Sequence, residues 1–313
     1  MTSNFSTTIE NEAFVDWGID NMTNASIVIY LVYVATACIG LPGNLLVISC
    51  FLLSPHLKKW RKTTKMSYYI ISLGLVDFLT CINVTAIYVF GSYFSKFIDN
   101  DFTCKVFGSS YFLMGMSITS SWHIVMVAIE RFLAVCHAVY HRLNFNKLKI
   151  FVSICVCYFF GFCTTLLHIP LLFRIDENGV CSTTYFEMEK WIQKFQSLTF
   201  LVIFALAPSS VIVPMYILII LKLAKAKKGT TVNKASVKVV KTSIVVFVAF
   251  MICNYPTAFF WAWDICMENP LDYSTWYGQS LVLLMSVSAC LNPIIYSFSI
   301  PEFTKAILMK SMN

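Results

Sequence analysis

The sequence has 313 residues, of which 58% are hydrophobic and 12% are charged, and its formal net charge is +7. An ordinary soluble domain is about half apolar and about one quarter charged. The composition therefore excludes an ordinary soluble domain and indicates a protein whose main solvent is lipid.

Seven long segments carry no Lys, Arg, Asp or Glu, apart from Asp77 in the second of them. A helix of about 20 apolar residues is long enough to cross a bilayer. The segments lack the alternation of barrel strands, so we expect helices, which satisfy their own backbone groups. The sequence predicts an all-α membrane protein, a seven-transmembrane helix bundle forming one domain over residues 27–299. The expected helices are 27–53, 66–92, 104–136, 150–173, 195–223, 237–266 and 275–299.

The basic residues gather on one side of the predicted bundle. If the N-terminus lies outside, the inner side carries 18 of the 23 Lys and Arg residues. Inner loops of membrane proteins hold such an excess, so we expect a multi-pass plasma-membrane protein with residues 1–26 outside the cell. The positive charge then meets membrane lipid and needs no nucleic-acid partner. N-glycosylation is expected in the outer segment at Asn4, Asn21 and Asn24.

The C-terminal residues 300–313 have the pattern of a short amphipathic eighth helix. Phe303 and Ile307 share one face at helical spacing, while Lys305 and Lys310 can reach lipid phosphates. We expect this helix to lie along the inner membrane surface, followed by a short cytoplasmic tail.

Polar and helix-breaking residues interrupt the apolar segments, where each of them is costly and needs a reason. They are Gly43-Asn44 in the first helix, Leu73 and Asp77 in the second, Glu130-Arg131-Phe132 at the end of the third, Pro208 and Tyr216 in the fifth, Phe250, Cys253 and Pro256 in the sixth, and Asn292-Pro293-Ile294-Ile295-Tyr296 in the seventh. In this order, the set resembles the motifs of rhodopsin-like G-protein-coupled receptors. A purely structural interpretation makes the prolines helix kinks and the polar residues a hydrogen-bond cluster. It leaves the inner placement of Arg131 and Tyr296 unexplained.

The resemblance implies a receptor that activates a heterotrimeric G-protein. In the resting state, Glu130 would neutralise Arg131 near the inner membrane surface. A ligand bound outside would favour a state in which the sixth helix swings about Pro256 and opens an inner cleft. Arg131 would then leave Glu130 and meet Tyr216 and Tyr296. The residues implied in coupling and activation are Glu130, Arg131, Tyr216, Pro256, Asn292, Pro293 and Tyr296.

The resemblance also implies a buried sodium site. It maps onto Asp77, Ser120, Ser288 and Asn292, whose oxygen atoms are hard ligands that suit a small cation. An allosteric sodium ion is therefore one expectation, and a water-filled polar cluster around Asp77 is the alternative. The sequence indicates no other cofactor.

Cys104, Cys181 and Cys266 lie on the predicted outer side. We expect Cys104 and Cys181 to form a disulfide that pins the loop after the fourth helix across the mouth of the bundle, which leaves Cys266 over. Cys104 lies 27 residues before Arg131, a longer spacing than the family usually has. Either the third helix is extended or bulged at its outer end, or the bond is shifted.

Three features depart from the family's pattern. Asn254 stands where a tryptophan usually precedes the sixth-helix proline, and Ala138 stands where a proline is common. The fourth helix contains no tryptophan, with Phe159 and Phe160 near its usual place. The aromatic switch that is usual in the sixth helix of the family is therefore absent.

Two positions that anchor ligands in other members of the family narrow the ligand class. Leu113 stands where amine receptors carry an aspartate, so an amine ligand is not expected. Ser286 stands where opsins carry the lysine that binds retinal, so retinal attachment is excluded. The outer segments carry 13 acidic and five basic residues, an excess that would attract a cationic ligand, so a basic peptide is expected. The alternative is that outer loops are acidic simply because Lys and Arg are kept inside. The sequence does not predict which residues bind the ligand.

Two other protein classes remain as alternatives. A seven-helix ion or proton transporter could use Asp77 and Glu130 as intramembrane acids, but the two related halves of such transporters are not found in the sequence. An enzyme is not expected, because neither a zinc-protease motif nor a serine-hydrolase motif is present. His123, in the middle of the third helix, is interpreted as a hydrogen-bonding residue that faces the bundle.

Overall fold

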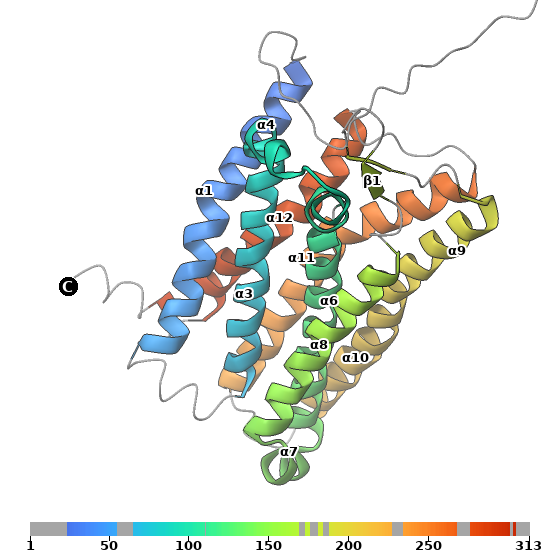
Figure 1. Ribbon diagram of the computed structural model, residues 1–313. Helices are drawn as coiled ribbons and strands as arrows, with labels where there is room; N and C mark the ends of the chain where they lie inside the picture. The colour runs from blue at the N-terminus through green and yellow to red at the C-terminus, as the bar shows by residue number, and fades with distance from the viewer. Residues whose placement is uncertain are drawn as a thin grey trace, which may run out of the picture.

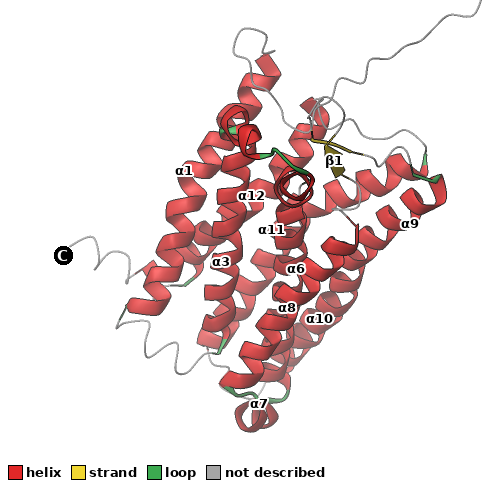
Figure 2. Ribbon diagram, viewed as in Figure 1, coloured by secondary structure: helices red, strands yellow, loops and turns green. Residues whose placement is uncertain are grey.

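A computed structural model describes residues 24–54, 65–109, 111–168, 173–175, 181–183, 188–226, 234–267, 276–300 and 303–304. Its long helices lie side by side in one bundle (Figure 1), and nearly all of the described chain is helical (Figure 2). Within the described ranges, seven helical segments are long and apolar enough to cross a membrane. The predicted seven-transmembrane helix bundle is confirmed.

The seven spans are not all built from a single α-helix, because three of them contain a π-helical turn, labelled η. The spans are α1 (Asn24–Leu53); α3 (Met66–Val84) with η2 (Thr85–Val89); α5 (Asp101–Thr103), η4 (Cys104–Gly108) and α6 (Tyr111–Cys136); α8 (Lys147–His168); α9 (Lys190–Leu201), η7 (Val202–Leu206) and α10 (Ala207–Ala226); α11 (Lys234–Cys266); and α12 (Trp276–Ser299). The short helices are α4 (Gly91–Phe94), the 3-10 turn η3 (Ser95–Phe97) and α7 (Ala138–Asn144).

A small antiparallel hairpin follows the fourth span, made of β1 (Phe173–Ile175) and β2 (Cys181–Thr183). The prediction that the fourth helix reaches residue 173 is wrong, because α8 ends at His168 and Phe173 begins a strand. Pro170 lies between them in the sequence. Proline lacks the N–H that a helix needs and disfavours helical geometry in the residue before it, which accounts for the early end.

The third span lies at the centre of the bundle. Its long helix α6 packs against α3, α8, α10 and α11, while α1 packs against α3 and α12. Figure 1 places β1 near one end of the bundle and α7 at the opposite end. We call the end with the hairpin the disulfide end and the end with α7 the Arg131 end, after the groups described below.

The polarity of the bundle is that of a lipid-solvated protein. Large apolar side chains are exposed on its outside, among them Leu53, Phe159 and Phe298. Polar side chains such as Asn44 and His123 are fully buried instead. The apolar outside suits hydrocarbon, and the polar residues inside must find partners there because no water is available.

Several predictions fall wholly or partly outside the described residues. The glycosylation sites Asn4 and Asn21 lie outside them, and Asn24 is the first residue of α1. Of the expected eighth helix, only residues 303–304 are described in helical form. Phe303 is buried there, with its ring stacked 5.6 Å from that of Phe51 in α1.

Candidate functional site

The Arg131 end holds a buried charge cluster. Glu130 and Arg131, consecutive in α6, are both buried, and the Nε of Arg131 donates a hydrogen bond to Glu130. The other carboxylate oxygen of Glu130 lies 3.0 Å from the Nε2 of His141. A carboxylate with two cationic or hydrogen-bonding partners is the way a buried acid becomes tolerable. The structure therefore shows the pair that the sequence predicts and adds a third member.

His141 belongs to α7, and that short helix is held at a second point. The Nζ of Lys65, just before α3, donates to the carbonyl oxygen of His141 at 3.2 Å and to that of Phe145. It also lies 5.7 Å from the centre of the Phe145 ring. The carbonyl of His141 also accepts the backbone N–H of Phe145 at 3.1 Å, so the lysine is a second donor to it. The carbonyl of Phe145 lies past the last turn of α7, where helical partners are missing. Neither His141 nor Lys65 could be recognised as part of the site from the sequence, because each lies in a basic loop and belongs to no motif.

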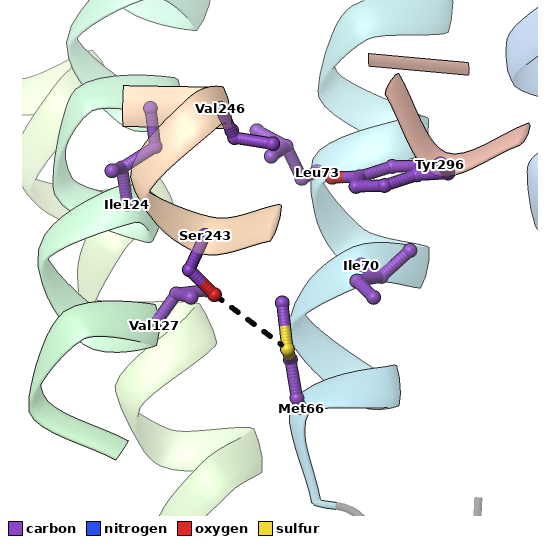
Figure 3. Close-up of a pocket in the computed structure, with 8 residues that line it drawn as sticks. All are labelled: Met66, Ile70, Leu73, Ile124, Val127, Ser243, Val246 and Tyr296. Atoms are coloured by element: carbon purple, nitrogen blue, oxygen red, sulfur yellow. Dashed lines mark hydrogen bonds between the residues drawn. The ribbon is translucent and has the colours of Figure 1, made fainter. Parts of the chain in front are cut away.

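Tyr216 and Tyr296, the predicted later partners of Arg131, are both buried near the Arg131 end. Among the described residues, the ion pair of Arg131 is with Glu130. Tyr296 instead lines a small apolar pocket with a volume of about 10 Å³ (Figure 3). Arg131 paired with Glu130 is the arrangement expected of the closed, resting state.

The pocket in Figure 3 lies between four spans and contains almost no polar surface. The polar contact drawn across it is the hydroxyl of Ser243 in α11, which lies 4.0 Å from the sulfur of Met66 in α3. An apolar layer of this kind keeps water out of the bundle between the two ends. The lining residues are Met66, Ile70, Leu73, Ile124, Val127, Ser243, Val246 and Tyr296.

Asp77 is the buried acid in the middle of the bundle. The amide nitrogen of Asn292 donates to it at 2.7 Å, so the structure brings these two predicted sodium ligands together. Ser120 in α6 is buried, and Ser288 donates its hydroxyl hydrogen to the carbonyl of Met285 at 2.8 Å. A hydroxyl that donates still has lone pairs for a cation. A carboxylate and neutral oxygens are ligand types that suit a small hard cation, and the contact shown among these four residues is that of Asp77 with Asn292.

Pro293 explains why an asparagine is needed in the first helix. Proline has no N–H, so the carbonyl of Ala289, four residues earlier, loses its helical donor. Asn44 of α1 donates to that carbonyl at 2.9 Å and to the carbonyl of Gly40 at 3.0 Å. A side chain added at Gly43 would lie 3.2 Å from the Pro293 ring, so glycine allows the two helices to approach. The motifs of the first and seventh helices thus form one contact between α1 and α12.

Pro208 in the fifth span has the same consequence. It leaves the carbonyl of Phe204 without its helical donor, and the hydroxyl of Ser121 in α6 donates to that carbonyl at 2.9 Å. In the sixth span, Pro256 lies within α11, and the amide of Asn254 donates to the carbonyl of Phe250 at 3.0 Å. Asn254 is therefore satisfied within its own helix by this bond.

His123 is fully buried, as the sequence analysis interpreted it. Its Nδ1 donates to the carbonyl of Thr119 at 2.8 Å, so its Nε2 accepts from the hydroxyl of Ser72, also at 2.8 Å. Tyr158 of α8 packs edge-on against the His123 ring, 5.4 Å away, and donates to the carbonyl of Ser72 at 3.3 Å. Tyr158, rather than the neighbouring exposed Phe159, joins α8 to α3 and α6.

At the disulfide end, Cys104 and Cys181 form the predicted disulfide, with Cα atoms 5.4 Å apart. Cys104 begins the π-turn η4, so the alternative of a bulged third helix accounts for its long spacing from Arg131. A side chain added at Gly108 would lie 2.6 Å from the sulfur of Cys181, so only glycine lets the loop dock here. Cys266 is a free, exposed thiol.

The hairpin contacts both the third span and α11 at the disulfide end. The backbone N–H of Ile175 donates to Asp101 at 2.9 Å. Phe173 packs against the cluster around the disulfide and also against Ile265 of α11, which Trp261 contacts as well. Leu113 is buried among apolar side chains, and the Ser286 hydroxyl donates to its own helix. Neither position offers a charge to an amine or an attachment point for retinal.

A model of the 7 transmembrane receptor (rhodopsin family) matches residues 43–296. The match covers the motifs from the first helix to the seventh, and the chain therefore belongs to this family of membrane receptors. A multi-pass protein of this family is a receptor and not the transporter that was the alternative.

Individual relatives share about a quarter of their residues with the chain. The substance-P receptor of Aquarana catesbeiana is 27% identical over 285 residues, which are 84% of this chain and 65% of that receptor. The allatostatin-A receptor of Bombyx mori is 25% identical, over 86% of this chain and 75% of its own length. The N-arachidonyl glycine receptor of Bos taurus is 22% identical, over 79% and 75% of the two chains.

Proposed function

We propose that the protein is a plasma-membrane receptor that binds an extracellular ligand at the disulfide end and activates a heterotrimeric G-protein at the Arg131 end. The observation that carries this proposal is the buried cluster of Glu130, Arg131 and His141. A buried ion pair rarely adds stability over apolar residues of the same size. Its presence at the mouth of a bundle is better explained by a second state in which the pair separates.

The orientation of the chain supports this assignment of the two ends. The disulfide requires an oxidising compartment, as found outside the cell. The loops at the opposite end carry most of the Lys and Arg residues of the sequence, as inner loops do. The N-terminus before α1 is then extracellular, and a G-protein meets the bundle at α7 and the ends of α10 and α11.

Nucleotide exchange tests the proposed activity directly. Membranes containing the protein would be mixed with each class of purified heterotrimeric G-protein, and exchange would be followed without ligand and with candidate ligands. Exchange on at least one class, lost in Arg131→Ala at equal surface level, is the expected result. No exchange with any class, under conditions in which a known receptor is active, would contradict the proposal.

For the ligand we propose a basic peptide. The acidic excess of the outer segments supports a cation, and Asp99, Asp101 and Glu189 are exposed at that end. The names of the relatives give substance P and allatostatin-A for two and N-arachidonyl glycine for the third. A panel of basic peptides and fatty-acyl amino acids, tested in the same exchange assay, separates the two chemistries. Activation by the acyl compounds alone would overturn the choice of a peptide.

We also propose that Asp77, Ser120, Ser288 and Asn292 hold a sodium ion in the closed state. The support is a buried carboxylate with one amide donor and neutral hydroxyls on the neighbouring spans. The ion would supply a positive charge that keeps Asp77 ionised in the bundle. The test of this site is given below.

A further inference from the structure

One hydrogen bond joins the fifth and sixth spans beside a proline in each of them. The hydroxyl oxygens of Ser209 in α10 and Tyr255 in α11 lie 2.7 Å apart. Ser209 directly follows Pro208, and Tyr255 directly precedes Pro256. Each proline removes a backbone hydrogen bond from its helix. The contact therefore lies at a point in each helix where a backbone hydrogen bond is missing.

The direction of this hydrogen bond follows from the other contact of Ser209. Its hydroxyl donates to the carbonyl of Ala205 at 2.7 Å. A serine hydroxyl has a single hydrogen, so Tyr255 must be the donor to Ser209. Both side chains are half-buried in the membrane-spanning part of the bundle. Hydrocarbon offers no replacement partner, so separating the two hydroxyls leaves one donor unsatisfied.

Aromatic packing fixes the ring that carries this donor. The Tyr255 ring lies edge-on to Phe204 at 6.4 Å and to Phe250 at 6.3 Å. Phe204 is in turn held to α6, because Ser121 donates to its carbonyl. Rotation of α11 about its own axis would carry the phenol oxygen at the tip of this long side chain away from Ser209, while the aromatic contacts could slide.

We propose that Tyr255 and Ser209 form a latch that holds α11 in its closed orientation, which makes Tyr255 a positioning residue for activation. The proposal rests on the proposed function, in which movement of α11 about Pro256 opens the Arg131 end. In the same turn, the amide of Asn254 bonds within α11. Tyr255 is the residue there that bonds to α10. Loss of its hydroxyl should favour the open state without a ligand.

The test measures the separation of α10 and α11 directly. Spin labels on unnatural amino acids at Lys225 and Lys238, which are exposed near the inner ends of the two helices, report the closed and open populations by electron resonance. The variants are Tyr255→Phe, which keeps the ring, Ser209→Ala, and the two combined. Ser210→Ala is the matched control, because that exposed hydroxyl donates only within its own helix to Ala207. Ser209→Thr keeps the hydroxyl and should restore the parent distribution.

We expect Tyr255→Phe and Ser209→Ala each to raise the ratio of open to closed receptor about threefold, and at most about twentyfold, as interhelical hydrogen bonds in membranes do. The double variant should show the same shift as either single variant, because both remove the same bond. An unchanged distance distribution in Tyr255→Phe, a shift toward the closed state, or a double shift equal to the product of the single shifts would overturn the latch.

Nucleotide exchange, measured in parallel at matched surface level, separates this proposal from the proposed function. A shift in the helix distances together with higher ligand-free exchange supports both proposals. A shift without any exchange in parent or variants supports the latch and contradicts G-protein coupling. Exchange in the parent with unchanged distances in Tyr255→Phe contradicts the latch and leaves coupling supported.

Discussion

Arg131 carries a buried charge that needs a partner of opposite charge. It is 6% exposed, and Glu130 beside it is fully buried. Removing one partner of a buried pair leaves the other charge uncompensated, which costs more than the pair itself contributes. The two residues therefore stabilise the closed arrangement as a unit, and changes to either one should alter the balance of states.

Glu130→Gln is expected to raise ligand-free nucleotide exchange. The glutamine keeps the shape of the side chain but removes its charge, so the closed state loses an interaction that the open state does not use. The pair is worth about 1–3 kcal/mol, and about 1.4 kcal/mol is a tenfold change in a two-state ratio. Exchange in membranes at matched surface level measures the change. Basal exchange equal to that of the parent would mean that the pair is not a lock.

His141→Leu should also raise basal exchange. It removes the 3.0 Å contact with Glu130 but leaves Arg131 in place, and one hydrogen bond to a charged group is worth about 1.5–3 kcal/mol, the same range as the pair. His137→Leu is the control, because His137 lies at the start of the same helix and packs edge-on against Phe132. Equal exchange in the two variants would assign any effect to α7 as a whole.

Asp77→Asn should abolish the sodium dependence of the open-to-closed ratio while leaving the protein folded. In the parent, added sodium should favour the closed state, and potassium at the same ionic strength should not. The amide keeps the hydrogen-bonding shape of Asp77 beside Asn292 but provides no charge for the ion. The spin-label distances described above measure the ratio. A parent that ignores sodium would favour the water-filled cluster instead.

At the scale of helices, glycines decide how closely α6 and α8 approach. A methyl group added at Gly161 of α8 would lie 2.8 Å from the carbonyl oxygen of Gly115 and 3.0 Å from the backbone nitrogen of Thr119. Both atoms belong to the backbone of α6 and cannot turn aside. Gly74 of α3 differs, because an added methyl would meet Ile48 at 3.4 Å, which is ordinary contact.

Gly161→Ala is therefore expected to destabilise the bundle by about 1–3 kcal/mol, as overpacking does. Gly74→Ala should leave the stability unchanged or raise it by up to about 1 kcal/mol, since alanine favours a helix over glycine. Thermal unfolding of the two purified variants, followed in one detergent, measures the difference. Unfolding of both variants at the temperature of the parent would contradict the close backbone contact between α6 and α8.

The π-turns within the spans were not predicted from the sequence. Helical periodicity of hydrophobic residues is similar in a continuous helix and in one with a single wide turn. The spacing between Cys104 and Arg131 was the one signal of η4, and it left two interpretations open. The disulfide decided between them, because docking Cys181 against Gly108 fixes where the extra length is placed.

At the scale of the whole molecule, the disulfide ties the third span to the hairpin over a separation of 77 residues. Cys104→Ser combined with Cys181→Ser should lower the free energy of unfolding by about 2–4 kcal/mol, because a long loop becomes free in the unfolded state. Cys266→Ser removes a free, exposed thiol and should have no effect. Thermal unfolding and surface level would be measured for both variants. An equal loss of stability in the double variant and in Cys266→Ser would contradict the Cys104–Cys181 pairing.

The sequence by itself determined the spans, the family and most of the polar residues of the core. These features are local: the apolar length needed to cross lipid is contained in each segment, and a proline breaks the hydrogen bonding of its own helix wherever that helix packs. The Glu130–Arg131 pair is present for this reason, because its members are adjacent in the chain. The Cys104–Cys181 disulfide is present as well, and it was predicted from the outer-side positions of the two cysteines.

Only the tertiary structure decided which distant residues meet. Asn44 reaches the carbonyl freed by Pro293, Ser121 the one freed by Pro208, and Tyr255 bonds to Ser209. Such pairs depend on how each helix is rotated about its axis and how closely its neighbours approach. Hydrophobic periodicity gives that rotation only coarsely in a lipid-facing helix, whose outer side is apolar as well. Packing of the seven spans against one another therefore selects the partners.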